Sequence, residues 1–465
     1  MTALTFAIGL LVIVVGLAIS IGLHEIGHLL PAKLFGVRVG RYMIGLGPTL
    51  WSRRFGETEY GIKALPLGGY ISMSGMYPPT PAEQERAANT SGSAGGNEQG
   101  ASGGAVAAQR SSRAAGMFAA MIQDARVANE ETMIGTPDTR TFYRLPVYKR
   151  IIIMLGGPVM NLLLAIVLFT LVFSGIGVQG ASTSVAAVSE CVVAAGSTQT
   201  ECAPGDPASP AAAAGILPGD RILSIDGTPV ETFNEASVII RDNPGTRLSF
   251  EIERDGAVQT LSVTPLLAER PVYDDAGNPV LDANGVAETQ DVGFVGITPA
   301  DELQRQPIGT GPQTAIENVG AVVGIVAQLP VKLYETGVAL FTGGERDPNG
   351  PMSVVGVGLI AGEVASTDTP ILSRVSVLLG LLGSLNIALF VFNLVPLLPL
   401  DGGHIVVALW EGVKKAWARL FRRPPPKPVD ATKLVPVTFV VVILLIGMGA
   451  LLLLADVFNP IQLFN

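Results

Sequence analysis

Four long apolar segments limit what this chain can fold into. They occupy residues 4–34, 151–178, 375–395 and 434–454. Each can cross the hydrocarbon core of a bilayer, which is about 30 Å thick and takes roughly 20 helical residues. The first segment lacks a basic start and is too long for a secretory signal, so we expect it to be retained. These features predict a multi-pass α-helical membrane protein with transmembrane regions at 1–40, 145–178, 375–412 and 434–457.

The distribution of charge predicts how these spans are oriented. Basic residues gather between the first and second spans and between the third and fourth spans. Because cytoplasmic flanks carry the excess of Lys and Arg, we expect both stretches in the cytoplasm and residues 179–374 outside it. The net charge of −9 argues against a nucleic-acid partner, which would require a basic face. The expected surroundings are the lipid bilayer of the plasma or inner membrane.

Three stretches between the spans differ in character. Residues 41–77 contain short β-type runs and predict membrane-associated β-hairpins. Residues 78–137 are dominated by Ala, Gly, Ser, Thr and Gln, which cannot bury a core, and predict a flexible low-complexity cytoplasmic insert. Residues 301–374 predict an interfacial helical segment rather than a fifth span, because polar residues and Pro330 interrupt the apolar run.

The stretch 181–300 predicts an extracytoplasmic α+β domain inserted between the spans. Its run GILPGDRILSIDG at 215–227 resembles the core of a PDZ domain. Strands are expected at 248–252 and 258–263, on either side of a turn at Asp255. PDZ domains bind an extended peptide as an added strand, so a peptide is the expected partner. An unrelated β-rich domain is the alternative interpretation.

The first apolar segment contains the sequence His24-Glu25-Ile26-Gly27-His28, which is the HExxH pattern. Residues four apart lie on one face of a helix with about 6 Å of rise between them, so both imidazoles can bind one Zn²⁺. Glu25 would take a proton from the zinc-bound water, whose pKa the metal lowers toward about 7. A chance scatter of polar residues is the alternative. It is weakened because two of only three histidines in the chain have this spacing.

Catalytic zinc needs a third protein ligand and one open position. Asp401 is an acid within the apolar run NLVPLLPLDGGH at 393–404, and His404 is a competing ligand. The first and third spans run in the same direction, and a rise of about 1.5 Å per residue brings His24 and Asp401 to similar depth on the cytoplasmic side. The sequence GGPVMN at 156–161 in the second span reaches the inner half as well, where Asn161 can face the site.

Together, these motifs identify a family resemblance. HExxH, GGPxxN, the PDZ core and NxxPxxxLDGG occur in this order within four spans. The chain thereby resembles the site-2 protease family, in its bacterial regulator-of-sigma-E-type branch with an inserted PDZ domain. The resemblance covers nearly the whole chain except the insert at 78–137. The chain departs from the pattern in that insert and in having one PDZ domain where some relatives have two.

The resemblance implies an intramembrane zinc metalloendopeptidase that acts in regulated intramembrane proteolysis. Its substrates would be single-pass membrane proteins, anti-sigma factors among them, already cleaved outside by a site-1 protease. The residues it implies are the zinc ligands His24, His28 and Asp401, the catalytic base Glu25, and substrate-binding residues Asn393, Pro396, Gly68, Gly69 and Tyr70.

Several alternatives stay open at this level. Asn393 and Pro396 can be ordinary helix-breaking and packing residues. A noncatalytic membrane scaffold that recruits partners is disfavoured because the HExxH set and Asp401 are complete, and a metal transporter is disfavoured because no discontinuous-helix repeat is visible. Cys191 and Cys202 lie in the stretch expected in the oxidising compartment, where a disulfide between them can form.

Overall fold

The computed structural model describes residues 3–76, 140–192, 202–203, 206–271, 288–348, 350–424, 426, 429 and 434–461. The expected insert at 78–137 lies outside these residues. The chain forms two compact units, one of Met1–Gly175 with Pro307–Asn465 and one of Ile176–Gln306.

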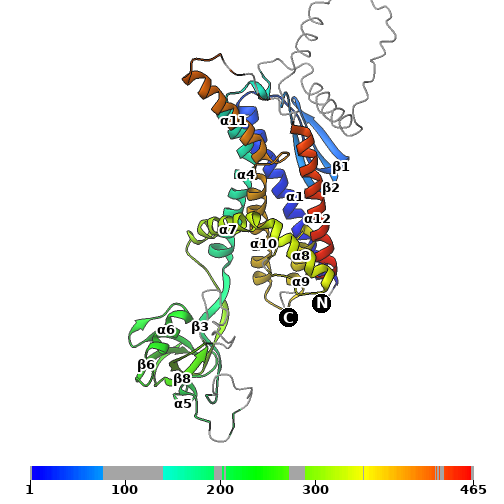
Figure 1. Cartoon of the computed structure of the whole chain (residues 1–465). Helices are drawn as coiled ribbons and strands as arrows, with labels where there is room; N and C mark the ends of the chain where they lie inside the picture. Colours follow the sequence, from blue (N-terminus) through cyan, green and yellow to red (C-terminus); the bar gives the residue numbers. More distant parts are fainter. Residues whose placement is uncertain are drawn as a thin grey trace, which may run out of the picture. The chain divides into compact units, whose positions relative to one another are not determined.

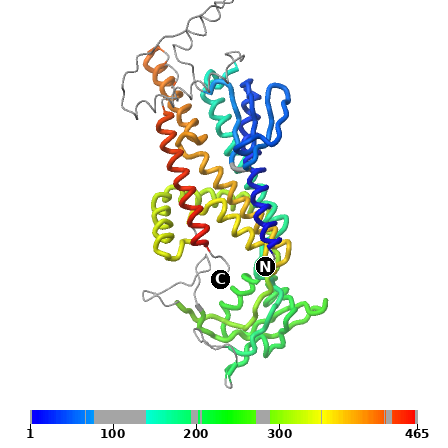
Figure 2. Tube along the Cα trace, turned by 90° about the vertical axis from the view of Figure 1, so that its right-hand side faces the viewer, coloured from blue at the N-terminus to red at the C-terminus, as the bar shows by residue number. Residues whose placement is uncertain are grey.

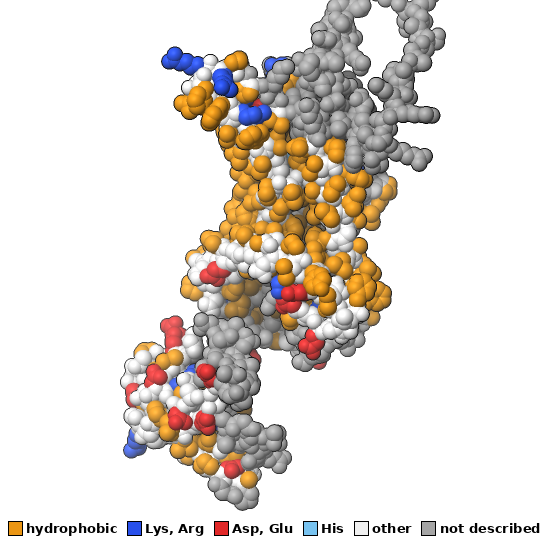
Figure 3. All heavy atoms as spheres, viewed as in Figure 1, with side chains coloured by type: hydrophobic (Ala, Val, Ile, Leu, Met, Phe, Trp, Pro, Cys, Tyr) orange, Lys and Arg blue, Asp and Glu red, His pale blue; other side chains and the backbone are white. Residues whose placement is uncertain are grey.

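Among the described residues, the first unit contains four helices that are long and apolar enough to cross a membrane. They are α1 (Ala3–Leu34), α4 (Val147–Thr170, continued to Ile176 by a turn of π-helix), α10 (Ile371–Asn393) and α12 (Val435–Phe458). Helices α1 and α10 both pack against α4 (Figures 1 and 2). Many of the outward side chains on these helices are apolar, and Figure 3 shows them covering this face of the unit. The four expected apolar spans are therefore confirmed.

The third span is shorter than the expected region 375–412. Helix α10 ends at Asn393, and a separate helix, α11 (Asp401–Leu420), begins after seven intervening residues. Pro396 and Pro399 lie between the two helices. Proline has no backbone N–H and disfavours helical geometry in the residue before it, so the helix cannot run through this stretch.

The expected interfacial segment at 301–374 divides into three helices with different surroundings. Helices α7 (Thr310–Ala327) and α8 (Leu329–Thr342) are bent by 71° relative to each other, and as a pair they also meet the length and composition of a broken span. Helix α9 (Val354–Ser366) is mostly buried and packs against α1. A β carbon at Gly9 would lie 2.2 Å from the Ala361 carbonyl oxygen, so the two backbones approach closely. Helix α9 is therefore enclosed by its neighbours within the unit, and the interfacial position of the segment stays a prediction.

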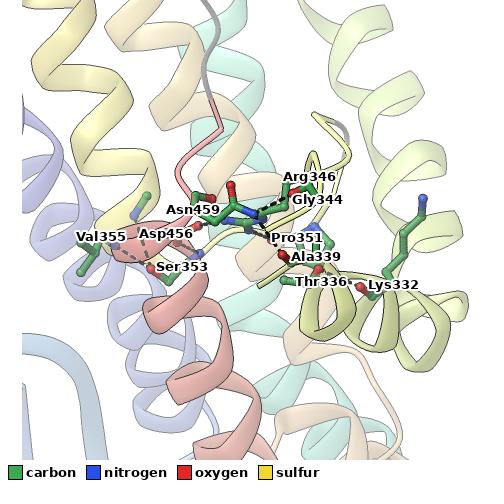
Figure 4. Close-up of polar contacts among 11 residues, drawn as sticks. Lys332, Thr336, Ala339, Gly344, Arg346, Pro351, Ser353, Val355, Asp456 and Asn459 are labelled. Atoms are coloured by element: carbon green, nitrogen blue, oxygen red, sulfur yellow. Dashed lines mark hydrogen bonds and ion pairs between the residues drawn. The ribbon is translucent and has the colours of Figure 1, made fainter. Parts of the chain in front are cut away.

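A buried ion pair connects the chain after α8 to the last span (Figure 4). Arg346 Nη1 donates to Asp456 Oδ1 of α12 at 2.6 Å, and both side chains are almost fully buried. The other Asp456 oxygen accepts the backbone N–H of Ser353, the residue that caps α9. Arg346 also donates to the Pro351 carbonyl. One carboxylate thus fixes the start of α9 and the loop before it to α12.

A small antiparallel sheet packs against α1. Its strands are β1 (Val39–Phe55) and β2 (Thr58–Met73). Both strands bend back, so that Met43 of β1 pairs with two different parts of β2, at Tyr70 and at Gly61. Within the described chain, the part of β2 from Gly69 to Met73 pairs only with β1, on one side. Its other edge pairs with no strand among the described residues.

The second unit is built on a six-stranded sheet. Five strands follow the order β10 (Ile297–Gln304), β3 (Val178–Val188), β4 (Arg221–Ile225), β6 (Leu248–Arg254) and β7 (Ala257–Val263), and β5 (Thr228–Pro229) pairs with β4. The remaining elements are α5 (Pro210–Ala213), α6 (Phe233–Asp242) and the pair β8 (Leu266–Pro271) and β9 (Thr289–Phe294).

A single apolar core holds this unit together. Phe250, Ile222 and Ile252 are fully buried in it, and Ile240 of α6 closes one side. The two strands expected around Asp255 are confirmed as β6 and β7, and Asp255 has a positive φ of 53° that suits a tight hairpin. Cys191 and Cys202, whose pairing the sequence left open, form a disulfide.

Candidate metal centre

The two histidines of the HExxH pattern lie one turn apart on the buried side of α1. Their ring centroids are 4.8 Å apart, and the Nε2 atoms of His24 and His28 are 3.2 Å apart. Both side chains are buried although they belong to an apolar helix. The i, i+4 spacing therefore aims both imidazole nitrogens at one point.

Asp401 comes to the same point from α11. Its Oδ2 atom lies 3.3 Å from Nε2 of His24 and 3.2 Å from Nε2 of His28. The two glycines that follow Asp401 make this placement possible. A β carbon at Gly402 would lie 2.3 Å from the Leu394 carbonyl oxygen, so only glycine lets the start of α11 pack under the preceding loop.

These three donor atoms have the spacing that a zinc ion requires. Bonds of about 2.0–2.1 Å from Zn²⁺ to N and O in a tetrahedral site place neighbouring donors about 3.3 Å apart. Asp401 Oδ2 is buried, yet no donor among the described residues makes a hydrogen bond to it. A buried carboxylate oxygen without a hydrogen bond is costly unless a cation pairs with it. His24, His28 and Asp401 therefore fit a metal ion, and His404 does not belong to this group.

Helix α4 orients both imidazoles through contacts with their Nδ1 atoms. His28 Nδ1 lies 2.7 Å from the Ile153 carbonyl oxygen, and His24 Nδ1 lies 3.1 Å from the amide nitrogen of Asn161. The expected position of Asn161 beside the site is thus confirmed. Contacts of this kind fix which ring nitrogen carries the proton and which one faces the metal.

Glycines allow α4 to approach α1 closely. A β carbon at Gly156 would lie 1.9 Å from the Gly27 carbonyl oxygen, and one at Gly27 would lie 2.2 Å from the Gly156 carbonyl oxygen. Small residues at this crossing thus permit close helix packing.

The β-sheet comes next to Glu25. A β carbon at Gly69 of β2 would lie 3.0 Å from Glu25 Cγ and 3.1 Å from the Met43 carbonyl oxygen. Tyr42 of β1 donates its hydroxyl to the Gly22 carbonyl oxygen on α1 at 2.8 Å. Burial and the Glu25 carboxylate raise the pKa of Tyr42 to about 12, so this hydroxyl stays protonated as a donor. The sheet is thereby fixed against the same turns of α1 that carry the HExxH motif.

The other residues expected to bind substrate have less defined surroundings. Asn393 is the half-buried last residue of α10, and Pro396 is exposed in the following loop. Gly68 is exposed with a positive φ of 85°, and Tyr70 lies half-buried beneath the ammonium group of Lys63. Of the five residues expected to bind substrate, the structure brings Gly69 against Glu25.

Sequence reasoning missed three features of the site. They are the Ile153 carbonyl, the close approach of Gly157 to the imidazoles, and a buried ion pair in which Arg150 of α4 donates to Glu411 of α11 at 2.5 Å. A backbone carbonyl leaves no signal in a sequence. Glu411 does leave one, because it is an acid followed by three basic residues in α11.

Comparison with known proteins agrees with this geometry. The model of peptidase family M50 matches residues 12–423. The zinc metalloprotease Rip1 of Mycobacterium tuberculosis is 31% identical over 99% of this chain and 100% of its own length. Rip1 of Mycolicibacterium smegmatis is 30% identical over the same shares, and the metalloprotease MmpA of Caulobacter vibrioides is 27% identical over 88% of each chain. The chain therefore belongs to peptidase family M50, the site-2 protease family, and is a zinc-dependent intramembrane protease.

Proposed function

We propose that this protein is a zinc endopeptidase that cleaves single-pass membrane proteins, with His24, His28 and Asp401 as zinc ligands and Glu25 as the catalytic base. The observation that carries the proposal is the triangle of donor atoms, whose sides are 3.2–3.3 Å. It is formed by two helices distant in sequence, α1 and α11. Glu25 follows the first ligand directly and is buried beside the triangle.

The chemistry divides between the metal and the chain. When bound, zinc lowers the pKa of a coordinated water and polarises the scissile carbonyl. The Glu25 carboxylate accepts the proton of the attacking water and can return it to the leaving amine. Ile153 and Asn161 hold the imidazoles in the orientation that presents Nε2 to the metal. Burial of Glu25 within an apolar helix limits the access of bulk water to these groups.

Substrate binding would use the free edge of β2. A transmembrane helix hides its peptide bonds in internal hydrogen bonds, so it must unwind before a nucleophile can reach them. An extended segment that pairs with Gly68, Gly69 and Tyr70 as an added strand would be held unwound next to Glu25. The contact between Gly69 and Glu25 supports this arrangement. Asn393 and Pro396 would contact the substrate from the end of α10.

The substrate class and the membrane orientation extend this proposal. We assign anti-sigma factors, already cleaved outside by a site-1 protease, as substrates. The excess of Lys and Arg around β1 and after α11 supports a cytoplasmic position for the end of α1 that carries the site. The unit at 176–306 would then lie outside as a PDZ domain that binds a peptide, which its sheet with a GILPGD turn supports.

Replacement of Glu25 by Gln tests the proposal. The purified variant should retain about one zinc per chain and lose cleavage of a reconstituted single-pass helix. The matched control is Glu317→Gln, which changes an exposed acid of α7 and should cleave like the unmodified protein. Substantial cleavage by Glu25→Gln would remove Glu25 from the role of base. Full zinc content in the double variant His24→Ala/Asp401→Ala would remove the proposed ligand set.

A further inference from the structure

Helix α11 has two faces of different character. One face packs on α4, where Glu411 accepts from Arg150 and is almost fully buried. The other face carries Trp410, whose exposed fraction is 58%, and Trp417, whose exposed fraction is 57%. Two indoles at i and i+7 lie on the same side of a helix. Both indoles are more than half exposed, and within the described residues the Trp417 ring centroid lies 4.5 Å from that of Phe421.

The chain folds back along this exposed face after α11 ends. Arg422 has a positive φ of 50°, which turns the chain sharply. The N–H of Arg423 then donates to the Ala418 carbonyl oxygen at 2.8 Å. Arg423 and Pro424 thereby come to lie beside the last turn of the helix. The result is a groove of about 550 Å³ between the helix and the returning chain.

The lining of this groove combines apolar walls with positive charge. Its described lining residues are Trp410, Val413, Lys414, Trp417, Ala418, Arg423, Pro424 and Pro426. The charged residues among them are both cationic, and no acid lines the groove within the described residues. A site with aromatic and proline walls and two cations suits an amphiphile with a negatively charged head.

The position of α11 in the chain favours a membrane lipid as this amphiphile. The helix lies between two spans, α10 and α12, so both of its ends are connected to segments in the bilayer. Figure 3 shows Lys and Arg side chains at the end of the unit where Figure 1 places α11, next to apolar surface. Tryptophan and basic residues are enriched where hydrocarbon meets headgroups. We propose that this groove binds an anionic phospholipid, with its phosphate on Lys414 and Arg423 and its acyl chains against Trp410, Val413 and Trp417.

The composition of the chain provides a direct probe of this site. It has three tryptophans, and two of them, Trp410 and Trp417, line the groove. A Trp51→Phe variant therefore confines tryptophan fluorescence to the proposed site. The full chain is placed in nanodiscs of phosphatidylcholine with about a fifth phosphatidylglycerol. In one sample the phosphatidylglycerol is brominated, and in the other an equal amount of the phosphatidylcholine is brominated, so the lipid composition is the same and only the quencher changes.

The proposal predicts stronger quenching by the anionic lipid. An interfacial basic residue enriches anionic lipid about fivefold, so brominated phosphatidylglycerol should quench several-fold more than brominated phosphatidylcholine. In Lys414→Gln/Arg423→Gln this ratio should fall to about one, while quenching by phosphatidylcholine persists and shows that the groove still faces lipid. The control Arg53→Gln/Arg54→Gln removes the same charge from exposed positions of β1 and should leave the ratio unchanged.

Three results would overturn the proposal. Equal quenching by both lipids in the Trp51→Phe protein would exclude selectivity for anionic headgroups. Absence of quenching by either lipid would show that the groove does not face the bilayer. A preference that survives in Lys414→Gln/Arg423→Gln would place the anionic lipid elsewhere. Because fluorescence is measured without substrate, these results do not depend on the proposed proteolysis.

Discussion

The α carbon of Gly157 lies against the imidazole of His28, so closely that a β carbon there would be 2.2 Å from the Nε2 atom of that ring. The same β carbon would be 2.7 Å from Nε2 of His24. Both nitrogens are the donor atoms of the candidate metal centre. Glycine on α4 therefore leaves the space in which two side chains of α1 and one of α11 can approach each other.

A methyl group at position 157 should displace the donors of the metal centre. In Gly157→Ala, the imidazoles must move because contacts below 3 Å are not tolerated, so we expect most of the bound zinc and of the proteolytic activity to be lost. Zinc content per purified chain is the measurement. Gly380→Ala is the control, since a β carbon at Gly380 of α10 meets nothing within 4 Å. Equal zinc content in both variants would contradict the prediction.

The side-chain atom that Asn161 presents to His24 should affect the zinc affinity of the site. Zinc coordination by Nε2 puts the ring proton on Nδ1, which then needs an acceptor. The Asn161 amide lies 3.1 Å away, and its Oδ1 is buried without a partner among the described residues, so rotating the amide satisfies both groups. Asn161→Leu should weaken zinc binding about 10–100-fold. Competition with a chelator measures this affinity, and Asn161→Asp should restore it because a carboxylate also accepts.

The ion pair between Arg150 and Glu411 should stabilise the position of α11. Their side chains are 8% and 2% exposed, and Lys415 also contacts Glu411. Removing one partner of a buried pair costs about 3–5 kcal/mol, because the other charge stays buried. We expect Arg150→Met to lower the midpoint of thermal unfolding in detergent. The double variant Arg150→Met/Glu411→Leu should regain most of the loss. A double variant that is no better than the single one would contradict this explanation.

The ligands of the metal centre could be predicted because local features of the sequence specify them. His24 and His28 have the spacing of one helical turn, and Asp401 is a single acid in an apolar run. The end of α10 and the bend after α7 coincide with prolines, yet the extents of the helices were predicted less well. Hydropathy alone does not distinguish one long segment from two helices joined by a loop.

Other features depend on contacts between distant segments and could not be predicted. The buried position of α9 follows from Gly9 and Ala361, which are far apart in the sequence. Glu411 looks like a solvated residue of a basic helix until Arg150 is placed against it by packing of α4. Pattern analysis identifies residues suited to a chemistry, whereas the residues that orient them are determined by how helices cross.

Stability of the second unit should depend on pH through Asp220. Arg254 donates to both oxygens of this carboxylate at 2.6 and 2.7 Å, and the Leu217 N–H donates to it as well. The hydrogen bonds from the Arg254 guanidinium hold the pKa of Asp220 below its usual value. Because the folded pKa is the lower one, this contribution is complete above the unfolded pKa of about 3.9 and is lost as pH falls through the folded value.

Asp220→Asn should therefore destabilise the unit at neutral pH, and the difference from the unmodified chain should shrink below about pH 4. Hydrogen exchange of β4 and β6 amides in the full chain, compared between proteins at each pH, measures the effect. Asp242→Asn, an exposed acid at the end of α6, is the control and should exchange like the unmodified chain at every pH. A difference for Asp220→Asn that stays constant from neutral to acid pH would show that the carboxylate acts through packing rather than through its charge.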